Sequence, residues 1–371
     1  MPNNIATVQH IARSALPHLI ENLVFPNLIH RDFSSEFAPG KGQTVRVRKP
    51  VIYEAHDFKD ADGIQMQDIQ EETVDVTLDK IASVDINVTA LEAATSFDDI
   101  DRLFIRPAAI ALAQKINADG LGLYADVYSC VGDPNVTPAS LDALAAIKGA
   151  LNDAKVPLTD RYAVLDTAAD TSLSMLPELV NAEKSGSTEA LREGSIGRVF
   201  GVNYYMSQAV KHHVSKLTAA KSVTIAGGAA KGATVINIAG TTLTGHMTKG
   251  DLLAISGKVY TVAEDSVAAS SNAINGVKIF PALAENAEAG TGVMPLGEHT
   301  ANLAFNKNAF AFVTRPLAKP AGVEAYTTSY NGISLRVTRG YDMKYKREIM
   351  SMDVLYGYKT VYPELAVRVL G

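Results

Sequence analysis

Apolar residues recur at three- and four-residue spacing over the first 25 residues, which predicts an amphipathic helix. Pro17 lies inside this pattern, and proline should kink or split a helix there. We expect residues 1–40 to form an N-terminal arm; an ordinary first helix of a domain is the alternative. The apolar positions are Ile5, Val8, Ile11, Ala12, Ala15, Leu16, Leu19, Ile20 and Leu23.

A second helical stripe begins near Ser96 and continues to about Ser129. Ser96 with Asp99 three residues later is a variant capping box, and acidic residues suit the positive end of the helix dipole. Thirty or so residues would span about 45 Å. A helix of this length is typical of one that spans a domain, and we assign residues 91–136 to it.

Between these helices the pattern changes to strict alternation of apolar and polar residues, which is typical of strands. Thr44–Arg48, Glu72–Asp79 and Val84–Val88 alternate in this way, while residues 54–70 contain few large apolar side chains. Such a segment cannot cover a core of its own. Residues 41–90 are therefore predicted to form a long two-stranded ribbon that lies against another surface.

The rest of the chain divides into three further segments. Residues 137–216 alternate between helix and strand signals, with Thr137-Pro138 as the expected start of a helix. Residues 217–298 have no helical stripe, only short β-prone runs separated by turn signals such as Asn275-Gly276, which predicts an inserted all-β domain. Residues 299–371 are strand-rich, and Asn331-Gly332 predicts a two-residue hairpin turn. The whole is an α+β fold.

Composition narrows the function classes. The chain has 371 residues, 47% hydrophobic and 20% charged, with a formal net charge of −6. An acidic balance argues against a protein whose main task is to wrap nucleic acid. Cys130 is the only cysteine, which excludes a disulfide framework within the chain and any multi-cysteine metal site. No apolar run approaches a membrane span, and no signal peptide is visible, so we expect no membrane partner.

No motif predicts catalysis, and we expect no catalytic residue, cofactor or metal. Residues 120–125 match G-x-G-x-x-A, but they follow a helix rather than a strand. Residues 57–63 hint at a calcium loop but lack its distal glutamate. Adjacent side chains such as His212 and His213 point to different sides of a strand or helix, so we interpret them as a solvated linker pair. Cys130 is interpreted as a small buried residue.

Charge is segregated along the predicted ribbon. One strand carries Arg46, Arg48 and Lys49, whereas residues 54–79 hold nine acidic residues against the single base Lys59. We expect these charges to meet opposite charges on neighbouring subunits, with Arg46, Arg48, Lys49, Asp57, Asp60 and Asp62 as candidate contacts. A compact basic cluster near the C-terminus is a candidate contact with DNA or with another subunit, the alternative being a solvated strand face. This cluster consists of Lys344, Lys346 and Arg347.

The order of these parts resembles the major capsid proteins of tailed bacteriophages, in particular the short-tailed-phage coat type with an inserted β domain. Three stretches carry the likeness. Residues 189–207 are similar to the family's G-x-I-G-x-x-x-G run ending in a strand, and residues 247–260 are similar to its K-G-D hairpin. Residues 331–370 are similar to the closing strands with a Tyr-Gly pair, here Tyr356-Gly357.

The resemblance implies an icosahedral head shell built of hexamers and pentamers around packaged double-stranded DNA. It implies that residues 41–90 are the extended loop, 91–136 the spine helix of the peripheral domain, 137–216 the axial domain, and 299–371 the return strands of both. Portal and scaffolding proteins are the implied partners, and the protein would be assembled in the host cytoplasm. The alternatives are a prokaryotic nanocompartment shell, an enzyme with an unrecognised site, or a β-rich adhesin or tail component.

Overall fold

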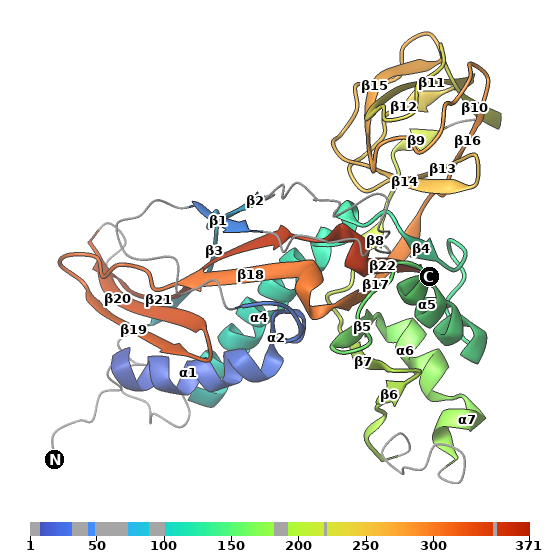
Figure 1. The fold of residues 1–371 in the computed structure, drawn as a ribbon. Coiled ribbons are helices and arrows are strands. Elements are labelled where there is room, and N and C mark those ends of the chain that lie inside the picture. The colour runs from blue at the N-terminus through green and yellow to red at the C-terminus, as the bar shows by residue number, and fades with distance from the viewer. Residues whose placement is uncertain are drawn as a thin grey trace, which may run out of the picture.

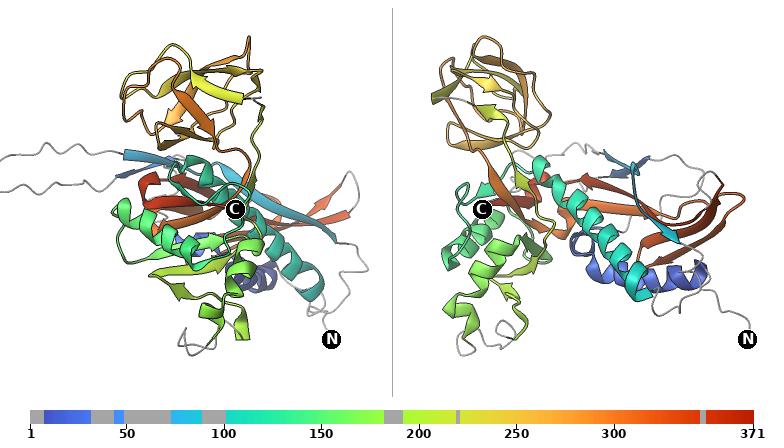
Figure 2. Two further views of the ribbon diagram at one scale, coloured as in Figure 1. Left: turned by 90° about the vertical axis from the view of Figure 1, so that its right-hand side faces the viewer. Right: turned by 180° about the vertical axis from the view of Figure 1, so that it is seen from behind.

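The computed structural model describes residues 8–31, 44–48, 73–88, 101–181, 192–218, 221–343 and 347–371. These residues form three regions, which are seen in Figure 1. A five-stranded sheet packed on helices forms the body, an α/β unit lies beside it, and a β-barrel stands above the place where the two meet. Figure 2 shows the barrel clear of the other two regions in two further views, joined to them at its base.

The body sheet is antiparallel, and strand β21 (Arg347–Thr360) lies at its centre. Around it the order is β18-β21-β20-β19, with β3 also paired to β21. The helices α1, α2 and α4 cover one side. The bounds are β3 (Lys80–Val88), β18 (Phe310–Arg315), β19 (Glu324–Tyr330), β20 (Ile333–Asp342), α1 (Val8–Asn22), α2 (Phe25–Leu28) and α4 (Arg106–Leu121). Asn331 and Gly332 both have positive φ, 51° and 74°, so the predicted hairpin turn between β19 and β20 is confirmed.

The N-terminal helix belongs to the core, which corrects the prediction of an arm for residues 8–29. Helix α1 runs without interruption through Pro17 and packs on α4, β19 and β20. The apolar stripe of α1 faces the core, and the free energy of this packing offsets the loss of the backbone hydrogen bond that Pro17 removes. The buried members are Val8, Ile11, Ala12, Ala15, Leu16 and Leu19.

The predicted long helix is three consecutive helical segments. A π-helical turn, η3 (Asp101–Ile105), precedes α4, and a 3-10 segment, η4 (Gly122–Asp126), follows it. Pro107 stands in the first turn of α4, where its missing N–H costs no hydrogen bond. The expected capping box at Ser96 lies outside the described residues.

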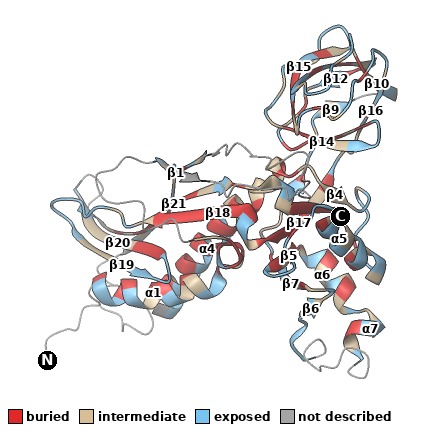
Figure 3. Ribbon diagram, viewed as in Figure 1, coloured by how far each residue is buried: buried red, intermediate tan, exposed pale blue. Residues whose placement is uncertain are grey.

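Gly120 in α4 explains the G-x-G-x-x-A match as a packing feature. A Cβ atom at this position would lie 2.5 Å from a ring carbon of Phe25 and 2.9 Å from the ring of Tyr358. Phe25 in turn contacts Phe305 and Phe310, with ring centroids 5.3 and 5.6 Å apart. The glycine therefore lets α4 approach an aromatic cluster, and the buried residues in Figure 3 concentrate along this contact.

The ends of the predicted ribbon lie on the body sheet. Strand β1 (Thr44–Arg48) pairs with β2 (Thr73–Thr77) in a two-stranded antiparallel sheet. Val76 is buried against Ala311 and Val313. A Cβ atom at Gly357 would overlap the carbonyl oxygen of Thr77, so this glycine of the Tyr-Gly pair permits the chain to cross over β21.

The α/β unit is built on a second sheet with the order β4-β22-β17-β5-β7-β6, and β8 also pairs with β17. Helix α5 begins at Leu141 with Ser140 as its N-cap, so the predicted start at Thr137-Pro138 is wrong. The Ser140 hydroxyl accepts from the Ala143 N–H, which satisfies one free donor of the first turn. The bounds are β4 (Cys130–Val131), β5 (Arg161–Leu165), β6 (Arg198–Val199), β7 (Val202–Met206), β8 (His212–His213), β17 (His299–Asn306), β22 (Ala366–Leu370), α5 (Leu141–Asp153), α6 (Thr167–Ser174) and α7 (Pro177–Val180).

The predicted all-β segment contains a closed barrel with the order β10-β11-β15-β14-β13-β16 and an apolar core of its own. The turn predicted at Asn275-Gly276 is wrong. Both residues lie within β15 as a bulge, where Gly276 has φ +73° and its N–H donates to the side chain of Asn237. The barrel bounds are β10 (Lys221–Ile225), β11 (Val235–Thr241), β13 (Leu252–Ile255), β14 (Lys258–Val262), β15 (Ala273–Phe280) and β16 (Gly292–Pro295).

Short elements complete the described chain: β9 (Leu217–Thr218) pairs with β12 (Thr244–Gly245), and two 3-10 turns, η5 (Lys307–Ala309) and η6 (Pro363–Leu365), lie near the C-terminal strands. None of the helices described is both long enough and apolar enough to span a bilayer.

Candidate functional site at the base of the barrel

Most of the candidate contact residues from the sequence lie outside the described part of the chain: Lys49, Asp57, Asp60, Asp62, Lys344 and Lys346. Arg46 and Arg48 lie in β1, and Arg347 is the first residue of β21. The register of β1 and β2 places Arg46 opposite Asp75.

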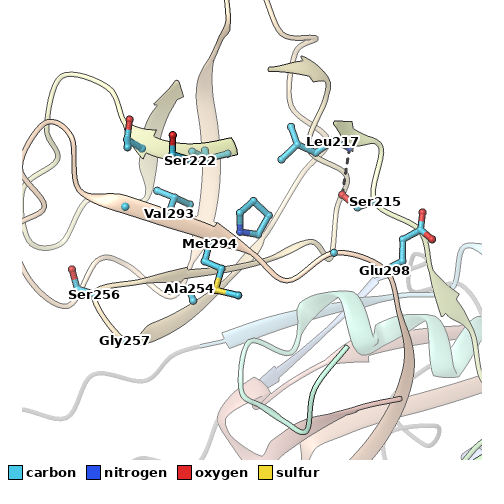
Figure 4. A pocket seen from close by; sticks show the side chains of 14 residues that line it. Ser215, Leu217, Ser222, Ala254, Ser256, Gly257, Val293, Met294 and Glu298 are labelled. Carbon is cyan, nitrogen blue, oxygen red and sulfur yellow. Dashed lines mark hydrogen bonds between the residues drawn. The ribbon is translucent and has the colours of Figure 1, made fainter. Parts of the chain in front are cut away.

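A groove of about 900 Å³ lies between the barrel and the segments that join it to the rest of the chain. Its lining is mostly apolar and hydroxyl side chains, among them Leu217, Val293 and Met294, seen in Figure 4. Glu298 is the only ionisable side chain in the lining. A catalytic cleft usually brings several ionisable groups together, and the lining of this groove contains one.

Metal-binding and thiol chemistry find no support in the described residues. Within these residues, no group of three or more His, Cys, Asp or Glu side chains could hold a metal ion. Cys130 is half-buried in β4, and burial raises the pKa of its thiol, which disfavours the reactive thiolate.

A cluster of hydrogen-bonded polar side chains is buried where the barrel meets the other two regions, and we call it the joint. It consists of Tyr124 from η4, His213 from β8, Asp251 beside β13, His299 from β17 and Arg368 from β22. Four of these, all but Tyr124, are buried. Buried polar groups are costly unless they are hydrogen-bonded, so such a cluster needs a structural reason.

His213 corrects the interpretation of residues 212 and 213 as a solvated pair. Its neighbour His212 is exposed, as alternation along a strand requires, but His213 is 3% exposed. Its Nε2 lies 2.8 Å from the Asp251 carboxylate, and its Nδ1 lies 2.9 Å from the Tyr124 hydroxyl. A neutral imidazole fits both contacts, with Nε2–H donating to the carboxylate and Nδ1 accepting from tyrosine.

Arg368 holds the end of α4 and the barrel together. Its guanidinium donates to the carbonyl of Gly250 in the barrel at 2.7 Å, and to the carbonyls of Tyr124 and Val127 at 2.6 and 2.9 Å. It also lies 5.0 Å from the centroid of the Tyr124 ring. Burial lowers the pKa of Arg368 to about 10, and the side chain still carries its charge at neutral pH.

His299 closes the cluster from the other side. Its Nδ1 lies 3.0 Å from the carbonyl of Gly297, which assigns the proton to Nδ1. Its Nε2 then has a free lone pair, and the Arg368 guanidinium donates to it at 3.3 Å. Burial lowers the pKa of His299 to about 4, and the charge of Arg368 adds to the effect.

The K-G-D stretch supplies the barrel half of the joint, each residue in a different way. Lys249 forms an ion pair with Asp126 at 2.8 Å. Gly250 has φ +93°, and a Cβ atom there would lie 2.9 Å from the Cβ of Ala125. Asp251 accepts from His213 and from the backbone N–H of Thr248.

Two further contacts support the joint: the Thr261 hydroxyl donates to the carbonyl of Ala125 at 2.9 Å, and the rings of Tyr128 and Phe280 pack edge to face. Sequence reasoning quoted the K-G-D stretch only as a family likeness. It missed His213, His299 and Arg368, because residues separated by 69 or more positions share no local pattern.

Comparisons with known proteins give a family match for the C-terminal part of the chain and a likeness in fold for nearly all of it. Residues 207–371 match the family model described as P22 coat protein, gene protein 5. A solved structure from Mycobacterium phage Che8 has a TM-score of 0.53 with this chain at 18% identity, covering 94% of this chain and 90% of that one.

Two capsid structures show weaker likeness. The capsid structure of the cyanophage P-SCSP1u has a TM-score of 0.49 at 12% identity, with 94% and 88% of the two chains covered. The asymmetric unit of the bacteriophage PhiM1 mature capsid has a TM-score of 0.46 at 10% identity, with 94% and 86% covered. A comparison with curated proteins gave no match.

Residues 207–371 are therefore similar to a coat protein family, and the chain shares the fold of the Che8 structure. The part that matches the P22 coat protein family contains the barrel and the closing strands. Similarity of this part of the chain to a family of coat proteins favours a structural role over an enzymatic one.

Proposed function

We propose that many copies of this chain assemble into a closed icosahedral shell of hexamers and pentamers that encloses double-stranded DNA. The observation that carries the proposal is the match of residues 207–371 to a coat protein family in a chain with the phage capsid fold. DNA is then a partner by enclosure, without sequence recognition. Assembly takes place in the host cytoplasm, and a portal and a scaffolding protein are the further partners.

Electron microscopy with sedimentation tests this function directly. The protein expressed alone, and again with its scaffolding partner, should give closed shells or capsomer-sized rings. A stable monomer under both conditions would contradict the proposal. A nanocompartment shell is the alternative, and a specific cargo protein that copurifies with the particles would favour it; the match to a coat family favours the phage shell.

The division into regions is part of the proposal. Residues 217–298 act as a domain inserted between the axial segment 137–216 and the return strands 299–371. Supporting this, the barrel has its own apolar core, and β8 and β17, which flank it, pair with each other at His213 and His299. A chain in which a short Gly-Ser linker replaces residues 217–298 should keep the body and α/β unit folded, by circular dichroism.

Contacts between subunits use the segregated charges of residues 41–90. Arg46, Arg48 and Lys49 face acidic surfaces on neighbours, and Asp57, Asp60 and Asp62 face basic ones. Lys344, Lys346 and Arg347 contact DNA or another subunit. Charges at such interfaces set register and association rate more than affinity.

The double variant Arg46→Glu with Arg48→Glu tests the charged ribbon. It should impair shell formation while the unassembled chain keeps its circular dichroism spectrum. Lys231→Glu, which reverses a single charge at an exposed residue of the barrel, is the control for charge reversal away from the ribbon. Normal shells from the double variant would contradict this assignment.

A further inference from the structure

The joint combines two features that are seldom found together: it is buried, and it contains two imidazoles beside a permanent cation. Arg368 is 0% exposed and His299 is 0% exposed. Asp251 is the only carboxylate among the five joint residues. At neutral pH, Arg368 and Asp251 therefore balance each other, and the cluster tolerates no additional charge without cost.

His299 is the member whose protonation the geometry opposes. Its Nε2 lone pair is the acceptor of the hydrogen bond from Arg368, so a proton at Nε2 replaces that bond with a contact between two cations 3.3 Å apart. His213 differs, because its Nε2 already faces the carboxylate of Asp251.

Arg368 and Asp251 are the permanent charges inside the cluster, and Lys249 with Asp126 forms a neutral pair at its rim. Among the described residues, the hydrogen bonds of the His299 ring go to the Gly297 carbonyl and to Arg368, and none goes to a carboxylate. The titratable groups from the packed elements are Arg368 and Cys130 on β22 and β4, His212 and His213 on β8, Tyr124 on η4, Asp251 beside β13, and the exposed Glu298 next to His299 in the chain.

We propose that the joint is an acid-released lock: a proton taken up from solvent by Nε2 of His299 breaks the contact with Arg368 and frees the barrel from the end of α4, while the barrel and the rest of the chain stay folded. The lock is local, because the barrel keeps its own apolar core and the body keeps its own. On release, the contact between Arg368 and Gly250 breaks, and so does the contact between His213 and Asp251. The lock lies within a single chain, so its opening does not depend on shell assembly.

The sign of the pH dependence follows from linkage. In the closed joint the pKa of His299 is about 4, against an ordinary value of 6.5. The open state therefore binds the proton more tightly, and opening becomes more favourable as the pH falls from 6.5 towards 4. The change in the opening equilibrium approaches about 300-fold below pH 4 and is absent above pH 7.

Distance measurement between two spin labels on the full, unassembled chain tests the lock. Labels on Lys231→Cys in the barrel and Asp153→Cys in α5, in a Cys130→Ser background, should give one narrow distance at pH 7.5. The distribution should broaden between pH 6.5 and 4, while circular dichroism stays constant. NMR titration of the His299 ring should give the same midpoint.

Two variants separate His299 from its neighbours. In His299→Gln, the amide oxygen still accepts from Arg368 but does not titrate, so the narrow distance should persist at low pH. His212→Gln, which changes the exposed histidine beside it, should behave like the parent. Either an unchanged distance while His299 titrates, or the same broadening in His299→Gln, would overturn the proposal. If His299→Gln is already open at pH 7.5, the parent chain decides. Equal midpoints for the broadening of the label distance and for the NMR titration of His299 support the lock, and different midpoints reject it.

Discussion

The N-terminal helices and the barrel both attach to α4 and the segment that follows it, but through opposite chemistry. Helices α1 and α2 pack by apolar side chains, with Phe25 fitted over Gly120. The barrel attaches mainly by hydrogen bonds and charges around Arg368, His213 and Asp251. Apolar burial stabilises without directional preference, whereas a hydrogen-bonded cluster is satisfied in few orientations.

This difference suggests what each attachment is for. The apolar contact makes α1 a permanent part of the body. The joint holds a domain that folds around its own core, and it fixes where that domain points. The Nε of Arg368 is buried without a hydrogen-bond partner, so the joint is not the most stabilising solution for this volume. Orientation is therefore the better explanation of its polar character.

The largest expected effect comes from Arg368→Leu. It leaves Asp251 without the balancing cation and three carbonyls without a donor, so the free energy of unfolding should fall by about 3–5 kcal/mol. Denaturant unfolding of the unassembled chain measures this. Arg198→Leu, at an exposed arginine, is the control and should change stability by about 0.5 kcal/mol or less. Equal losses in the two variants would remove the special role of the joint.

Gly120→Ala examines the apolar attachment. Alanine favours a helix by about 1 kcal/mol over glycine, but here its Cβ meets the Phe25 ring, and overpacking costs about 1–3 kcal/mol. Thermal unfolding should therefore show a net loss. The matched control is Gly149→Ala in α5, where a Cβ meets nothing within 4 Å, and which should gain about 1 kcal/mol. A gain at both positions would mean that the close approach of α4 to Phe25 is unimportant.

Gly250→Ala and Gly257→Ala separate backbone strain from contact at the barrel. Both glycines have positive φ, +93° and +76°, so both substitutions cost about 1–2 kcal/mol in strain. Only at Gly250 does the new Cβ meet Ala125, which should add about 1 kcal/mol and displace the barrel. The label distance described above should change for Gly250→Ala and not for Gly257→Ala. Identical behaviour would show that the barrel is not held at this point.

The smallest effect is expected at the rim. Lys249 is about half-exposed in its ion pair with Asp126, so Lys249→Ala should cost under about 1 kcal/mol, and less at high salt. The control is Lys258→Ala, which breaks an exposed ion pair between two residues of the barrel domain, Lys258 and Glu285. If Lys249→Ala lowered the free energy of unfolding as much as Arg368→Leu does, the exposed ion pair and not the buried cluster would hold the barrel in place.

Sequence periodicity predicted the elements well where the pattern is local. The stripe of α1, the strands of the barrel and the Asn331-Gly332 turn each depend on residues close together in the chain. The burial of α1 was not predicted, because an amphipathic stripe does not reveal its partner. The turn predicted at Asn275-Gly276 was wrong for a related reason. The side chain of Asn237, on another strand, accepts from the Gly276 N–H, and the two residues form a bulge instead of a turn.

The joint was beyond prediction from the sequence alone. Tyr124, His213, Asp251 and Arg368 come from four separate elements, and only the fold brings them together. His213 shows the limit clearly: alternation correctly separates it from His212, but nothing local tells which of the two is buried. The K-G-D stretch was the one signal available, since a charged tripeptide at a strand start is an unusual place for a close backbone contact.

The central claim is that this chain forms a phage shell in which the barrel is carried in a fixed orientation by the joint. A cryo-electron microscopy map of particles assembled at neutral pH tests both parts at once. The account predicts a closed icosahedral shell whose subunits keep Arg368 against Gly250 and His213 against Asp251, with the barrel resolved beside the end of α4. Particles in which the barrel is ordered but separated from α4, or the absence of any shell in the presence of the scaffolding partner, would contradict it.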